Sequence, residues 1–276
     1  AQADNDPVLI AETGGQNVLV SDSSALPEQV VADVLSSAFD SAGQRCSALR
    51  ILLLQEDVAD HYYKMITEAI NEFSLGDPRL LSTDIGPVID QEAKQNLENH
   101  KANMRKVARA YVELEAPTNG HFVAPAVYLL DNLNQLQREV FGPILHIVRY
   151  KKENLVNVLN EVNAKGYALT GGCHSRIRKQ MDLVEKHLHC GNFYINRNIV
   201  GAVVGVQPFG GHGLSGTGPK AGGEFYLQRL TKTDRYYSQF GDENSLGNAQ
   251  PILDSITGER NSLAYLPSEV AILNGD

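Results

Sequence analysis

One cysteine of the sequence has the surroundings of a covalent nucleophile. Cys46 follows Gly43, Gln44 and Arg45 in a turn between a predicted helix and a predicted strand. A neighbouring cation and turn amides stabilise a thiolate, so we expect the pKa of this thiol to be lowered and its sulfur to be reactive. The alternative is a buried, unreactive cysteine, which is the commoner state of a lone cysteine.

Two carboxylates have positions that suit complementary roles. Glu12 precedes a pair of glycines in AETGGQN, where a tight backbone lets the acid face an adjacent cleft. There it can act as a general base that activates water. Glu139, in REVFGP, can instead accept hydrogen bonds from the two hydroxyls of a ribose. A solvated turn glutamate is the alternative interpretation of each.

Glycines are concentrated in one segment, with ten of the 24 between Gly191 and Gly223, which indicates backbone turns close to a ligand. The run GGHGLSG has the letters of a dinucleotide fingerprint, but it lacks the preceding strand and the following helix, and Pro219 stands in the way. His187 and His189 are two residues apart on a predicted helix and point to different faces. We therefore predict no metal site.

An α/β domain is expected to position these residues. Strand-like and helix-like segments alternate, which is typical of a largely parallel sheet flanked by helices. The patterns predict strands at 18–20, 49–54, 111–114, 122–130, 144–150, 167–171 and 192–196, and helices at 27–42, 58–73, 91–110, 153–164 and 177–189.

Composition excludes several classes of protein. The 276 residues are 42% hydrophobic and 21% charged, the balance of an ordinary globular chain. With 24 basic and 33 acidic residues, the net charge of −9 disfavours nucleic acid and anionic lipid as partners. No apolar stretch approaches the roughly 20 residues that span a bilayer. Three widely spaced cysteines and the lack of a signal-peptide pattern lead us to expect a cytoplasmic protein.

Four motifs occur in one order along the chain: ETGG at 12–15, GQRCS at 43–47, EVFGP at 139–143 and PFGG at 208–211. Together they resemble the aldehyde dehydrogenase superfamily, and within it the Δ1-pyrroline-5-carboxylate (L-glutamate γ-semialdehyde) dehydrogenases. The resemblance implies an aldehyde dehydrogenase catalytic domain. It also implies NAD-dependent oxidation of L-glutamate γ-semialdehyde to glutamate in proline catabolism.

The resemblance assigns roles to four of these residues. Cys46 would attack the aldehyde carbon, giving a thiohemiacetal that loses hydride to the nicotinamide and becomes a thioester. Glu12 would activate the water that releases the acid. Glu139 would hold the nicotinamide ribose, and Phe141 would pack beside the cofactor. The backbone amide of Cys46 would be one oxyanion donor.

In this branch of the family the aldehyde carries an α-amino acid group, so its carboxylate needs an anchor. The resemblance places Arg45 and Ser47 beside the nucleophile for this purpose. It also implies that the backbone amides of Gly201 and Ala202 bind the substrate carboxylate, and that Phe209 forms a wall against the aliphatic chain. Glycine at position 201 lets an amide approach an anion closely.

The same resemblance predicts two regions: residues 1–235 as the catalytic domain of a longer chain, and residues 236–276 as a linker or the start of a C-terminal module. The family keeps most of its nucleotide-binding part ahead of the base motif, where this chain begins. We therefore expect the 276 residues alone to bind NAD weakly and to turn over slowly or not at all. Similar long chains continue into a flavin-dependent proline dehydrogenase domain, and homo-oligomers are compatible with the sequence.

Two other functions remain open from the sequence. One is a cysteine-dependent acyl-transfer or esterase domain that needs no nicotinamide, because a thiolate and a carboxylate suffice for ester hydrolysis. The other is a non-catalytic domain that serves assembly.

Overall fold

The computed structural model describes residues 8–230, 252–253 and 259–263. The chain forms two compact units. The larger contains Glu12–Gly201 and Gly211–Gly216, and the smaller contains Ala1–Ala11, Ala202–Gly210 and Thr217–Asp276. Most of the predicted C-terminal region 236–276 lies outside the described residues.

A seven-stranded sheet forms the centre of the larger unit, in the order β3-β4-β5-β2-β1-β7-β8. All neighbouring strands are parallel except β3 and β4. The α/β fold with a largely parallel sheet is thus confirmed. The strands are β1 (Asn17–Ser21), β2 (Leu49–Gln55), β3 (Ala110–Glu113), β4 (Ala126–Leu130), β5 (Ile144–Tyr150), β7 (Thr170–His174) and β8 (Asn192–Ile195).

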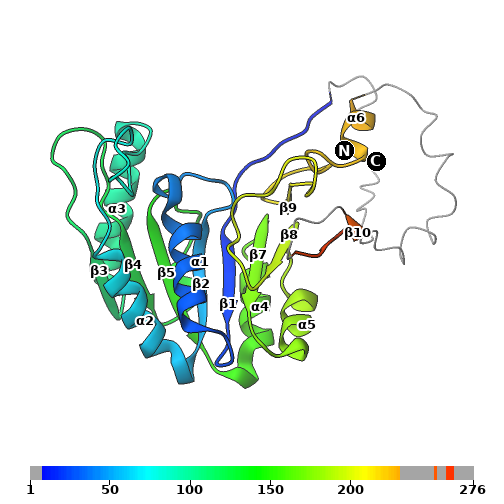
Figure 1. The fold of residues 1–276 in the computed structure, drawn as a ribbon, viewed down its shortest axis with the longest axis horizontal. Helices are drawn as coiled ribbons and strands as arrows, with labels where there is room; N and C mark the ends of the chain where they lie inside the picture. The colour runs from blue at the N-terminus through cyan, green and yellow to red at the C-terminus, as the bar shows by residue number, and fades with distance from the viewer. Residues whose placement is uncertain (1–7, 231–251, 254–258, 264–276) are drawn as a thin grey trace, which may run out of the picture. The chain divides into compact units, whose positions relative to one another are not determined.

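Helices cover both faces of this sheet (Figure 1). On one face α1 (Pro27–Phe39) and α2 (Glu56–Ile70) pack, and on the other α3 (Gln91–Val107), α4 (Leu155–Asn163) and α5 (Arg178–His187). The central strand β2 shows why: its sequence LRILLLQ is buried at all seven positions, as expected for a strand enclosed on both sides. Leu52 belongs to the hydrophobic cluster on the face of α1 and α2, and Leu53 belongs to the cluster on the face of α3, α4 and α5.

The helix predicted at 27–42 ends earlier than the sequence pattern suggests. After α1 the chain forms a 3₁₀ turn at Asp40–Gly43, in which Ser41 and Ala42 have φ angles of 57° and 53°. This left-handed backbone cannot continue an α-helix. It turns the chain into the segment that carries Cys46.

Two predicted strands also differ from the structure. The strand predicted at 122–130 begins only at Ala126, because Pro125 has no N–H to donate to a neighbouring strand. The strand predicted at 167–171 is two strands. β6 (Tyr167–Ala168) pairs antiparallel with β9 (His212–Gly213), whereas β7 joins the main sheet.

The smaller unit contains the helix α6 (Phe225–Arg229) and the antiparallel pair β10 (Ile252–Leu253) and β11 (Asn261–Ser262). Phe209 and Ala221 form an isolated antiparallel bridge in it, with N–H···O distances of 2.9 and 2.8 Å. Across the part of the chain that the structure describes, no helix has the length and apolar character needed to cross a membrane.

Candidate active site

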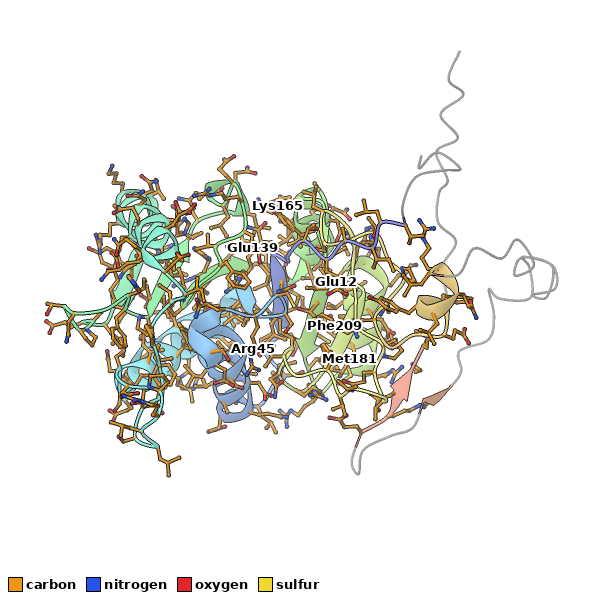
Figure 2. All side chains as sticks on the ribbon, turned by 90° about the horizontal axis from the view of Figure 1, so that it is seen from above. Glu12, Arg45, Glu139, Lys165, Met181 and Phe209 are labelled. Carbon is orange, nitrogen blue, oxygen red and sulfur yellow. The ribbon has the colours of Figure 1, made fainter. Side chains whose placement is uncertain are left out.

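The order of the strands gathers three of the predicted site residues at one edge of the sheet. β5, β2 and β1 are adjacent and parallel, so their amino ends meet at the same edge. Glu12, Cys46 and Glu139 lie in the segments that precede these three strands. Figure 2 looks onto this edge and shows Glu12, Arg45 and Glu139 over the middle of the sheet.

Glycines let these segments approach one another. A Cβ atom at Gly14, whose φ is +126°, would lie 2.2 Å from Glu139 Oε2, and one at Gly15 would lie 2.9 Å from the carbonyl oxygen of Cys46. A Cβ at Gly43 would lie 2.2 Å from the carbonyl oxygen of Gly142. The glycines of the first two motifs are therefore contact points between the segments, and no other residue fits there without displacement.

A buried asparagine holds the segment of the nucleophile. The side-chain amide of Asn17 donates to the carbonyl oxygens of Cys46 (2.7 Å) and Ala48 (2.8 Å) and accepts from the backbone N–H of Thr170 (3.0 Å). The Thr170 hydroxyl donates to the carbonyl of Ser47 at 3.2 Å. The sequence analysis missed Asn17, although a polar residue at the start of an otherwise apolar strand is a signal for such a clamp.

The expectation that Arg45 lowers the pKa of Cys46 was wrong. Cys46 is an exposed residue, but the partial burial of its sulfur raises the pKa of the thiol. The negative charges of Glu12 and Glu139 raise this pKa further. The N–H of Ser47 opposes these effects. The Arg45 side chain is directed elsewhere, since its Nε donates to Ser41 Oγ at 3.0 Å.

Glu12 is exposed, and its backbone is held by a short segment of the same unit. Glu12 forms an antiparallel bridge with Gly216. The neighbouring Thr13 donates from its N–H to the carbonyl of Ser215 at 3.3 Å and from its hydroxyl to the carbonyl of Leu214 at 2.6 Å. The carboxylate is thus free to face solvent while its charge acts on Cys46.

Glu139 lies half-buried beside a cavity of about 330 Å³. Burial raises the pKa of this carboxyl, while the N–H of Gly15 and the charge of Arg50 favour its ionised form. Within the described residues its Oε1 atom is buried and accepts no hydrogen bond. The cavity is also lined by His100 and by Phe141, whose ring is 45% exposed.

The remaining predicted residues divide between the two units. Ser47 is buried next to Cys46, and Gly201 is exposed with φ +74° and open space around the position of a Cβ. Both belong to the larger unit, whereas Ala202 and Phe209 belong to the smaller one. No group of His, Cys, Asp and Glu side chains suited to a metal ion occurs within the residues for which the structure gives positions.

Two histidines form a pair at the cavity, where His100 is partly buried and His146 is fully buried. The Nε2 atoms of His100 and His146 are 2.8 Å apart, and His146 Nδ1 lies 3.0 Å from the carbonyl oxygen of Arg50. Because a carbonyl can only accept, Nδ1 of His146 carries its proton, and in the neutral ring Nε2 then accepts from His100. Burial lowers the pKa of His100 to about 4 and that of His146 to about 3.

This pair predicts a loss of stability in acid. Both rings have folded-state pKa values below the ordinary 6.5, so the unfolded chain binds more protons as the pH falls from 6.5 toward 4. Each histidine should cost up to about 1.4 kcal/mol of unfolding free energy per pH unit in this range. Urea unfolding at several pH values should show that His100→Gln reduces this slope, whereas His61→Gln, at an exposed position of α2, leaves it unchanged. Equal slopes for the chain and His100→Gln would contradict the assignment.

Comparison with known proteins identifies the family. The family model described as the aldehyde dehydrogenase family matches residues 1–235. The chain belongs to the aldehyde dehydrogenase family. The resemblance carried by the four motifs is therefore confirmed. The chain covers only part of the length of its relatives in this family.

Curated relatives of this aldehyde dehydrogenase chain include two kinds of enzyme. It is 56% identical over 230 residues to the bifunctional protein PutA of Escherichia coli strain K12. The matched region spans 80% of this chain and 17% of the relative. It is 36% identical over 222 residues to the 1-pyrroline-5-carboxylate dehydrogenase of Geobacillus sp. strain WCH70, spanning 79% of this chain and 43% of the relative. The chain thus spans less than half the length of either.

Solved structures show the same similarity. A crystal structure of bifunctional proline utilization A (PutA) protein matches with a TM-score of 0.79 and 55% identity, over 83% of this chain and 23% of that one. The 1-pyrroline-5-carboxylate dehydrogenase from Thermus with bound NAD matches with a TM-score of 0.72 and 31% identity, over 80% of this chain and 43% of that one.

Proposed function

We propose that this chain carries the nucleophile and the base of an NAD-dependent dehydrogenase that oxidises L-glutamate γ-semialdehyde to glutamate in proline catabolism. The observation that carries the proposal is the meeting of Glu12, Cys46 and Glu139 at one sheet edge, with both carboxylates acting on the thiol. The name of the 1-pyrroline-5-carboxylate dehydrogenase relatives points to this substrate, because L-glutamate γ-semialdehyde is the hydrolysed, open-chain form of that cyclic imine.

Each residue has one part in the reaction. The Cys46 thiolate attacks the aldehyde carbon and forms a thiohemiacetal, with the backbone N–H of Cys46 stabilising the oxyanion. Loss of hydride leaves a thioester on the sulfur. Glu12 takes a proton from water, which attacks the thioester carbon and releases the carboxylic acid and the free Cys46 sulfur.

The residues present fit the ribose and nicotinamide half of NAD. The buried Oε1 of Glu139 accepts no hydrogen bond within the described part of the chain, and a ribose hydroxyl would supply the missing donor. Phe141 offers an exposed ring at the same cavity. When bound, NAD supplies the hydride acceptor. Since these contacts address only one half of the cofactor, we expect weak binding of NAD and slow turnover by the 276 residues alone.

We further propose that the substrate carboxylate is bound by Arg45, Ser47 and the amides of Gly201 and Ala202, with Phe209 against the aliphatic chain. By the same likeness to the PutA relatives, we propose that this domain works in a polypeptide that also oxidises proline.

Protection of the thiol tests the proposal without requiring turnover. A thiohemiacetal blocks alkylation, so glutamate γ-semialdehyde should protect Cys46 from iodoacetamide, as measured by peptide mass spectrometry. Because propanal lacks the amino acid group, it should need at least about tenfold higher concentration for equal protection, which corresponds to about 1.4 kcal/mol of binding. Equal protection by both aldehydes would refute the substrate assignment. Protection that appears at Cys190 but not at Cys46 would refute the nucleophile.

A further inference from the structure

Arg50 is a cation buried beneath the candidate active site. It is the second residue of β2, and its side chain is 1% exposed. Its Nη1 donates to the carbonyl of Gly142 at 3.0 Å, and its Nη2 donates to the carbonyl of Arg45 at 3.2 Å. Arg45 immediately precedes the nucleophile, and Gly142 lies in the EVFGP motif. One guanidinium therefore bonds to both segments.

The same guanidinium also meets the side chains of that motif. Arg50 Nη2 lies 3.9 Å from Glu139 Oε1, and the guanidinium carbon lies 5.1 Å from the centroid of the Phe141 ring. A buried charge is costly, and an apolar side chain of the same volume often stabilises a fold equally well. Within the described residues Arg50 Nε has no hydrogen-bond partner. Fold stability alone therefore does not account for a charge at this position.

We propose that Arg50 is a positioning residue of the dehydrogenase reaction, which holds the loop of Cys46 against the Glu139 segment and places a positive charge under both. This inference rests on the function proposed above. Arg50 does not touch the substrate in this role, because it acts through the Arg45 carbonyl, the Glu139 carboxylate and the Phe141 ring. The planar fork of arginine suits two carbonyl acceptors at once, which the ammonium group of lysine matches less well.

The charges around the Cys46 sulfur predict the direction in which its pKa changes when Arg50 is replaced. Glu12 and Glu139 raise the pKa of the Cys46 thiol, and Arg45 is turned toward Ser41. Burial lowers the pKa of Arg50 to about 10, against the opposing effects of Glu139 and Cys46, so the guanidinium remains charged at neutral pH. Removing this cation should raise the pKa of the thiol, whereas removing the Glu139 carboxylate should lower it.

The test is the pH profile of Cys46 alkylation by iodoacetamide, followed by peptide mass spectrometry on the chain and its variants. Arg50→Met should shift the profile to higher pH by about one unit, which slows the reaction about tenfold at pH 7.5. Arg50→Lys should recover most of this loss because it keeps the charge. Glu139→Gln should shift the profile the opposite way.

Arg149→Met is the matched control. Arg149 lies on β5 and pairs with Asp60, away from the amino ends of the strands, so its loss should leave the profile unchanged. If Arg50→Met does not fold, the double variant Arg50→Met/Glu139→Gln removes both charges of the pair, and it should still react more slowly than Glu139→Gln alone. An unchanged profile, while Cys46 remains the fastest thiol, would overturn this inference but not the proposed function. A slow Cys46 in the unmodified chain would overturn the proposed function itself.

Discussion

Cys46→Ser should remove the reactive thiol of the chain without loss of the fold. When the unmodified chain is treated with p-nitrophenyl acetate, we expect one acyl group on Cys46, and the variant should acquire it at least about 10³-fold more slowly, because a serine hydroxyl is a far weaker nucleophile than a thiolate at neutral pH. Mass spectrometry of the intact chain and its peptides measures this difference. Since Cys46 is exposed, the free energy of unfolding should change by less than about 0.5 kcal/mol.

The other cysteines provide the controls for this experiment. Cys173 is buried on β7, and its burial raises the pKa of its thiol to about 12, so it should acylate the slowest. Cys190→Ser should leave the rate at Cys46 unchanged. A Cys46→Ser variant that acylates as fast as the unmodified chain would favour the non-catalytic assembly domain. Acylation by itself does not separate a dehydrogenase from an esterase, whereas selective protection by glutamate γ-semialdehyde does.

The central strands, and the site residues that precede them, could be predicted from the sequence. Buried parallel strands are continuous apolar runs, so β2 and β5 were predicted to within one residue at each end. Because Glu12, Cys46 and Glu139 each precede such a strand, their meeting depends only on which strands are neighbours. Strand order itself is a long-range property that periodicity does not contain.

The electrostatics of the site could not be predicted in the same way. The sequence shows that Arg45 is adjacent to Cys46, but it does not show that the Arg45 side chain bonds to Ser41 or that Arg50 lies beneath the segment instead. In the sequence, Arg50 is only a charged residue that interrupts the apolar pattern of the strand at 49–54. Its partner carbonyl at Gly142 is 92 residues away in the chain, so only the folded structure reveals the contact.

Glu12→Gln should separate two steps that share Cys46. Glu12 raises the pKa of the Cys46 thiol, so its neutralisation increases the thiolate fraction at a given pH and should speed acylation. Hydrolysis of the acyl-Cys46 thioester should instead slow by about 10²-fold or more, because general-base activation of water contributes roughly 10²–10⁴-fold. The variant should therefore stay acylated at Cys46 for longer than the unmodified chain, which hydrolyses its acyl group faster.

Opposite changes in the two steps distinguish a general base from a residue that merely supports the loop. A structural role would slow both steps, since displacing the Cys46 segment affects attack by the sulfur and attack on its thioester alike. Single-turnover deacylation, followed by the decay of the acylated mass, measures the second step independently of the first. Glu68→Gln, on the exposed face of α2, removes a carboxylate of the same kind and should leave both rates unchanged. Deacylation of Glu12→Gln at the rate of the unmodified chain would assign the water activation to another group.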